Sequence, residues 1–78
     1  MARRVSPLVR KLAFRIRELR RAQRLTVEQA ARRYGCSHRW WVSLEQGQNV
    51  SVDTLARIAK VLGSSPARLI GVEGVHED

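Results

Sequence analysis

Five positions along the chain carry residues that typically begin an α-helix. These positions are Ser6, Thr26, Ser37, Ser51 and Ser65. Ser6 and Ser65 are each followed by proline, which suits the first position of a helix because its missing N–H needs no partner there. Thr26 is followed three residues later by Gln29, which is the capping-box pattern. Since no stretch alternates polar and apolar residues as a strand would, the sequence predicts an all-α fold of five helices.

Apolar residues follow these starts at the three- and four-residue spacing that gives a helix one buried face. They are Leu8, Leu12, Ile16 and Leu19 in the first helix, Ala30, Ala31 and Tyr34 in the second, Trp41 and Leu44 in the third, Leu55, Ile58, Ala59 and Leu62 in the fourth, and Leu69 and Ile70 in the fifth. We therefore expect a basic N-terminal arm over residues 1–6, one compact domain over 7–70 and a flexible acidic tail over 71–78.

The net charge of +8 is unevenly distributed along the chain. Residues 1–40 hold twelve Arg and Lys against two acidic residues, whereas residues 41–78 hold three against five acidic residues. A polyanion would therefore be attracted to the first half of the chain. Charge alone does not distinguish a nucleic acid from an acidic protein or an anionic membrane, and a solvated surface is the simpler alternative.

The residues that catalysis or metal binding requires are scarce in this chain. The single cysteine, Cys36, excludes an intrachain disulfide and a zinc site built on several thiolates. Neither His38 nor His76 has a partner at catalytic spacing, and there is no glycine-rich phosphate loop. No apolar run indicates a signal peptide or a membrane span. We therefore expect a cytoplasmic protein that is not an enzyme, with no catalytic residue, no metal, no cofactor and no membrane contact.

The middle of the chain predicts two short helices joined by a tight turn, which is a helix-turn-helix. The segments LTVEQAARRYGCSHRWWVSLEQG and SVDTLARIAKVLGSSPARLI closely resemble the phage repressor and Cro-like (XRE) family, from about Leu12 to Ile70. The resemblance implies a compact five-helix, lambda-repressor-like domain with its helix-turn-helix at about residues 26–46. It also implies a single-domain regulator that is bacterial or phage-encoded and is associated with the nucleoid when it is bound to DNA.

The same resemblance implies a sequence-specific transcriptional regulator, a repressor or controller, that binds double-stranded DNA. A homodimer would read a palindromic operator with its third helix in the major groove. The family pattern places the base-reading side chains at His38, Arg39, Trp40 and Ser43, of which Arg39 suits a bidentate pair with guanine. The residues that it implies for phosphate contacts are Lys11, Arg17, Thr26, Val27, Arg32, Arg33, Ser37, Gln48 and Asn49.

Two positions depart from the family pattern. Val27 stands where the family usually has a glutamine that holds a DNA phosphate, so that contact is lost unless the backbone N–H at the start of the helix replaces it. Arg24 stands where the family usually has glycine. The phosphate contacts are therefore expected to shift to the arginines of the first helix and to Arg32 or Arg33.

Trp40 and Trp41 lie about 100° apart around a helix axis, so both cannot face the core. On the family pattern, Trp41 is the core residue and Trp40 lies on the outer face. The alternative for Trp40 is packing against a side chain of the preceding helix, such as Arg33 through a cation–π contact. His38 could equally be a solvated or capping residue, and Arg39 a plain surface charge.

Two other residues carry expectations about packing. Glu45 lies near the predicted end of its helix, where the helix dipole favours a cation. The resemblance pairs Glu45 with Arg20 in a half-buried structural ion pair, and the alternative is an exposed acid of no consequence. On the family pattern, Cys36 occupies a small apolar position that usually holds valine, so it is expected to be an inert buried thiol, with a redox sensor as the alternative.

Two kinds of protein partner complete the expectations. A second copy of the chain would bind through the weakly charged second half, at Val50, Leu69, Ile70 and Val72. A different protein is the partner in the alternative function, a helix-turn-helix antitoxin or adaptor whose exposed Trp40 and Val42 contact protein. Salt dependence distinguishes this alternative from DNA binding, because phosphate contacts weaken steeply as salt rises.

Overall fold

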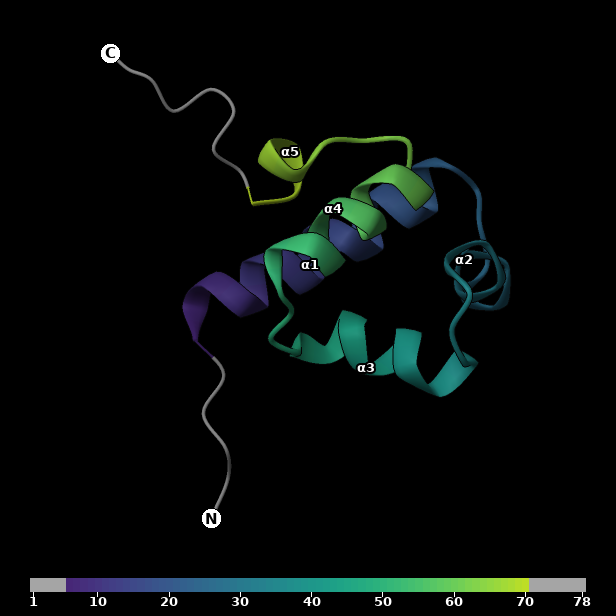
Figure 1. Cartoon of the computed structure of the whole chain (residues 1–78), viewed down its shortest axis with the longest axis horizontal. Helices are drawn as coiled ribbons and strands as arrows, with labels where there is room; N and C mark the ends of the chain where they lie inside the picture. Colours follow the sequence, from purple (N-terminus) through teal and green to yellow (C-terminus); the bar gives the residue numbers. More distant parts are fainter. Residues whose placement is uncertain (1–5, 71–78) are drawn as a thin grey trace.

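The computed structural model describes residues 6–70 (Figure 1). These residues form five α-helices joined by short connections and contain no strand. The helices are α1 (Pro7–Ala22), α2 (Val27–Tyr34), α3 (His38–Gly47), α4 (Val52–Val61) and α5 (Pro66–Ile70). The predicted all-α class is therefore confirmed. Residues 1–5 of the expected arm and the whole expected tail, 71–78, lie outside the described residues. Within the described range, no helix is both long enough and apolar enough to span a membrane.

Each predicted helix start is capped by the side chain that the sequence indicates. Hydrogen bonds of 3.0–3.1 Å run from the backbone N–H three residues along the chain to the hydroxyl oxygens of Ser6, Thr26, Ser37 and Ser51. At α5 the N–H of Arg68 donates to Ser65 at 3.3 Å. The side chain of Gln29 completes the capping box by accepting from the N–H of Thr26 at 2.8 Å. Each cap satisfies a backbone donor that the helix itself cannot.

Two tight connections use the left-handed region of the backbone. Gly35 ends α2 with a φ of 92°, and its N–H and that of Cys36 donate to the Ala31 carbonyl at 2.8 and 3.0 Å. Arg24, between α1 and α2, has a φ of 57°, although this region is unfavourable for an L residue with a side chain. Its N–H donates to the carbonyl of Arg21 at 2.9 Å. The connection from α1 to α2 therefore carries strain at the position where the family resemblance expects glycine.

One hydrophobic core joins the five helices around Trp41, whose side chain is fully buried. Its other members are Leu12, Ile16, Leu25, Ala30, Ala31, Leu44, Ile58, Ala59, Leu62 and Leu69. α1 packs against α3 and α5, α2 packs against α3 and α4, and α4 packs against α5. In Figure 1, α3 runs along one edge of the molecule and α2 stands nearly end-on beside it.

The predictions of burial are confirmed in the helix interiors and are wrong at the start of α1. Leu8 was predicted to be buried and is 61% exposed, because burial on α1 begins one turn later, at Leu12. The predicted core residues that pack against the core but remain partly exposed are Leu19, Tyr34, Leu55 and Ile70. Leu25 lies in the connection between α1 and α2, so helical spacing did not predict its burial.

Candidate nucleic-acid interface

α2 and α3 meet at a turn of three residues, from Gly35 to Ser37. The Ser37 hydroxyl accepts from the N–H of Trp40 at 3.0 Å and so fixes where α3 begins. Trp41 and Leu44 then hold α3 against the core, with exposed fractions of 0% and 1%. The result is a helix-turn-helix at the predicted position, with the second helix on an edge of the molecule (Figure 1).

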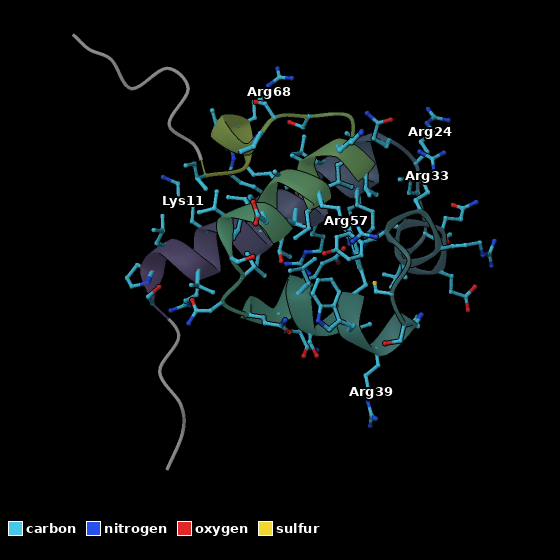
Figure 2. All side chains as sticks on the ribbon, in the orientation of Figure 1. Lys11, Arg24, Arg33, Arg39, Arg57 and Arg68 are labelled. Carbon is cyan, nitrogen blue, oxygen red and sulfur yellow. The ribbon has the colours of Figure 1, made fainter. Side chains whose placement is uncertain are left out.

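The outer face of α3 presents the predicted base-reading residues to different degrees. His38 and Arg39 are exposed in the first turn of the helix. Figure 2 shows Arg39 extending away from the body of the protein. Trp40 and Ser43 are partly buried. A ligand that approaches α3 would therefore meet the imidazole and the guanidinium first.

Trp40 packs against α2, as the alternative interpretation of this residue expected, but through a different partner. Its indole stacks on the ring of Tyr34, with 5.1 Å between the ring centroids and 25° between the planes. The expected cation–π partner was Arg33. In Figure 2, Arg33 lies above α2 in the view, well separated from Arg39, which extends below α3. The indole of Trp40 is thus held by Tyr34 on one face and remains partly exposed beside Arg39.

The carboxylate of Glu45 accepts three hydrogen bonds at the contact between α1 and α3. Arg20 donates from Nε to Oε2 at 2.5 Å and from Nη2 to Oε1 at 3.1 Å. The indole N–H of Trp41 donates to Oε2 at 2.7 Å. The structure therefore brings Arg20 and Glu45 together, with side chains that are 12% and 9% exposed. The contribution of Trp41 was not predicted, although its position four residues before Glu45 placed the two on one helix face.

Arg57 on α4 is a further contact of the helix-turn-helix that sequence analysis did not single out. Its Nη2 donates to the backbone carbonyl of Tyr34 at 2.9 Å. Its guanidinium carbon also lies 4.5 Å from the centroid of the Tyr34 ring. These partners are separated by 23 residues along the chain, so no local pattern could have indicated the contact.

The residues expected to contact phosphate are spread over α1, α2 and the ends of α3. Those that are exposed are Lys11, Arg17, Thr26, Arg32, Arg33, Ser37 and Asn49, whereas Val27 and Gln48 are partly buried. Thr26 and Ser37 already use their hydroxyl oxygens to cap α2 and α3. Arg33 lines a surface cleft between α2 and α4 with Arg57, Lys60 and Val61. Figure 2 shows Lys11 at the other end of the molecule from Arg33.

The residues expected at a dimer interface differ in whether they can reach a partner. Leu69 is fully buried within its own chain, so it presents no surface to a second subunit in this structure. Val50 and Ile70 are partly buried and pack at the border of the core. Val72 lies outside the described residues.

The chemistry that this surface offers is hydrogen bonding and charge. Residues 6–70 contain no group of three or more His, Cys, Asp or Glu residues that could hold a metal ion. Cys36, in the turn before α3, was expected to be buried and is only partly buried. Burial nevertheless raises the pKa of its thiol above the ordinary value, and the positive charge of Arg57 offsets part of this rise. The thiol is thus a poor nucleophile near neutral pH.

The fold and this surface define a helix-turn-helix domain. A family model described as a helix-turn-helix domain matches residues 11–69, and the chain belongs to this family, whose members are DNA-binding transcription regulators of the XRE type. No curated protein matches the chain significantly.

Three solved structures show what the chain is similar to. The restriction-modification controller protein C.AhdI from Aeromonas hydrophila is 32% identical, with a TM-score of 0.73 over 78% of this chain and 94% of that one. The clp gene regulator ClgR from C. glutamicum is 26% identical, with a TM-score of 0.79 over 88% and 90%. The hypothetical transcription factor NHTF from Neisseria is 20% identical, with a TM-score of 0.76 over 90% and 85%, which supports the fold alone.

Proposed function

We propose that this chain is a sequence-specific transcriptional regulator, a repressor or controller, that reads a palindromic operator as a homodimer. The observation that carries the proposal is the exposed first turn of α3, with His38 and Arg39 on a helix whose other face is fixed in the core. A helix held in this way can enter the major groove as one rigid body. The likeness to a restriction-modification controller and to a gene regulator supports the same role.

The four base-reading residues take different parts in this proposal. Arg39 donates two hydrogen bonds to O6 and N7 of a guanine, which is the commonest specific contact in the major groove. His38 donates to a base acceptor or a phosphate, and Ser43 allows close approach or contacts a base edge. Trp40, supported by Tyr34, offers the exposed part of its ring to a thymine methyl or a deoxyribose.

The proposed phosphate contacts position α3 and carry no sequence information. The N-termini of α2 and α3 present backbone N–H groups beside Thr26, Val27 and Ser37, and such helix ends favour an anion. The remaining contacts come from side chains, namely those of Lys11, Arg17, Arg32, Arg33, Gln48 and Asn49.

A selection of bound sequences from a pool of random duplexes tests the proposal directly. We expect enrichment of a palindromic site, with a guanine at a position where Arg39→Ala relaxes the preference. Lys60→Ala is the control, because it removes one positive charge from α4 and should leave the preference intact. Equal binding of every duplex by the unaltered chain would refute sequence-specific regulation.

The homodimer follows from the limited reach of one recognition helix, which contacts only a few base pairs. Two-fold pairing doubles the site that is read. Val50, Ile70 and Val72 are the proposed contacts. Sedimentation should show a dimer at high micromolar concentration or on operator DNA, and a monomer under both conditions would contradict this part of the proposal.

The alternative function, an antitoxin or adaptor that contacts a second protein through Trp40 and Val42, has weaker support. Both side chains are partly buried, and Trp40 is covered on one side by Tyr34. The large apolar side chains with the greatest exposure in residues 6–70 are Leu8, Phe14 and Val52, which lie on α1 and α4. A binding constant for the natural partner that hardly changes with salt would favour a protein contact over DNA.

A further inference from the structure

We infer that Arg57 is a positioning residue for DNA reading: from α4 it fixes the first turn of α3 and so determines which bases His38 and Arg39 reach. This inference rests on the proposed function, because it concerns the same recognition surface. The contacts of Arg57 are with Tyr34, so it would act on His38 and Arg39 indirectly, through Tyr34 and Trp40.

The first step is the hydrogen bond from Arg57 to the end of α2. Tyr34 is the last residue of α2, and its carbonyl oxygen accepts from Nη2 of Arg57 at 2.9 Å. Carbonyls in the last turn of a helix have no partner inside the helix, and the helix dipole favours a cation there. A charged donor also gives a stronger hydrogen bond than a neutral one. Arg57 therefore holds the residue at which the chain turns toward α3.

The second step is the contact from Arg57 through the Tyr34 ring to α3. The guanidinium lies 4.5 Å from the ring centroid, within the range of a cation–π interaction. The same ring stacks on Trp40 at 5.1 Å and makes a T-shaped contact with Trp41 at 6.2 Å between the ring centroids. One side chain of α2 thus connects the guanidinium of α4 with two consecutive residues of α3.

The third step is the close approach of the Arg57 guanidinium to Gly35, in the turn between α2 and α3. A Cβ atom at Gly35 would lie 3.6 Å from Nη2 of Arg57, so the guanidinium is seated directly against the turn. The charge of Arg57 also reaches Cys36, the next residue, whose thiol pKa it lowers against the effect of burial. Arg57 is thus in contact with, or electrostatically coupled to, three consecutive residues that lead into α3.

Arginine is suited to this position because the two interactions occur together. A planar guanidinium can donate to a carbonyl and lie over an aromatic ring at the same time, whereas the ammonium of lysine is a point charge on a flexible stem. Base contacts made by α3 carry the sequence information, whereas phosphate contacts contribute affinity for every sequence alike. Loss of Arg57 should therefore reduce discrimination between sequences more than overall affinity for DNA.

The test compares Arg57→Lys and Arg57→Met with Lys60→Met, which removes a charge one turn further along α4. The dissociation constants are measured at one salt concentration for the selected operator and for a scrambled duplex. We expect both Arg57 variants to lower the ratio of operator affinity to scrambled-duplex affinity by about fivefold. Lys60→Met should leave this ratio unchanged, even if it weakens binding to both duplexes.

A spectroscopic readout separates repositioning from a general loss of structure. The near-ultraviolet circular dichroism that arises from the Tyr34–Trp40 stack should change in the Arg57 variants, while the far-ultraviolet signal of the helices is retained. If Arg57→Met does not fold, Arg57→Lys decides the outcome. An unaltered ratio in Arg57→Lys would overturn the inference while leaving the proposed function intact, whereas a wild type without any sequence preference would refute both.

Discussion

At the scale of single residues, Glu45 connects α3 with both α1 and the core. Its carboxylate lies near the end of α3, where the helix dipole disfavours an acid, yet it accepts hydrogen bonds from Arg20 and Trp41. A buried ion pair adds little net stability compared with an apolar substitute, but removal of one partner leaves the other charge uncompensated. The importance of this ion pair for stability is therefore best measured by removing one of its two residues.

Arg20→Ala should lower the free energy of unfolding by about 3 kcal/mol, because it leaves a nearly buried carboxylate with Trp41 as its remaining partner. Thermal melts of the variant and of Arg21→Ala provide the comparison, since Arg21 is an exposed neighbour with the same charge. Glu45→Ala and the double variant complete a cycle. Effects of Arg20→Ala and Glu45→Ala that simply add would show that the two residues are not coupled.

The two tryptophans should respond differently to truncation. Trp41→Ala removes the largest core side chain and should cost about 3–5 kcal/mol, enough to unfold a domain of this size. Trp40→Ala loses the stack on Tyr34 and should cost about 0.5–1.5 kcal/mol, with weaker operator binding as its main effect. A melt and a binding titration on each variant check this. Unfolding by Trp40→Ala alone would mean that α3 is rotated by one residue.

Cys36 should make the stability of the domain depend on alkaline pH. Its folded-state pKa is raised, so the protonated thiol is favoured by folding. The stabilisation is present below the ordinary thiol pKa of 9.0 and is lost as pH rises through the higher folded-state pKa. Melts of the wild type and Cys36→Ala under reducing conditions should therefore run parallel near neutral pH and diverge as the pH rises past the ordinary thiol pKa of 9.0, with the wild type losing more stability. Parallel profiles would exclude this linkage.

At the scale of the helices, most of the fold could be predicted because its determinants are local. A cap and its N–H lie three residues apart, and a buried face repeats every three or four residues, so the starts of all five helices and the inward position of Trp41 were predictable. Leu8 shows the limit of this reasoning. Its spacing fits the buried stripe, but whether another helix covers the first turn of α1 depends on the tertiary arrangement.

The candidate site was predictable in its position and less so in its contacts. The exposure of His38 and Arg39 follows from the cap at Ser37 and the helical period. The partner of Trp40 depends on how α2 crosses α3, and this angle selects Tyr34 instead of Arg33. The contact of Arg57 with Tyr34 joins elements that the sequence keeps 23 residues apart, so only the folded chain reveals it.

The connection between α1 and α2 offers a test of backbone strain. Arg24 is exposed and has a φ of 57°, so Arg24→Gly should relieve steric strain. The left-handed region costs an L residue about 1–2 kcal/mol, and the greater freedom of unfolded glycine offsets part of that gain. We expect a net stabilisation of about 0.5–1 kcal/mol, measured by denaturant unfolding. Arg24→Ala is the control for charge, and an equal stabilisation by alanine would attribute the effect to charge instead of strain.

At the scale of the whole molecule, the most distinct surface property is the uneven distribution of positive charge along the chain. The first forty residues carry twelve of the fifteen Arg and Lys. Those that are exposed within the described range lie on α1, in the connection from α1 to α2, on α2 and in the first turn of α3. The excess of positive charge on these elements attracts a polyanion to them. Association with DNA should therefore be driven by charge first and by base contacts second.

Salt dependence should separate these two contributions. For the unaltered chain, the logarithm of the affinity should fall steeply with the logarithm of salt concentration, because each phosphate contact contributes a slope of about −0.9. Arg33→Ala should weaken binding to all sequences alike and reduce the slope by about 1 if its side chain meets a phosphate.

Arg39→Ala should instead lower discrimination at one guanine by about 1–3 kcal/mol. Titrations of both variants on the operator and on a duplex with that guanine replaced make the comparison. Loss of discrimination in Arg33→Ala, with Arg39→Ala unaffected, would reverse the roles of α2 and α3, because the base-reading side chain would then lie on α2.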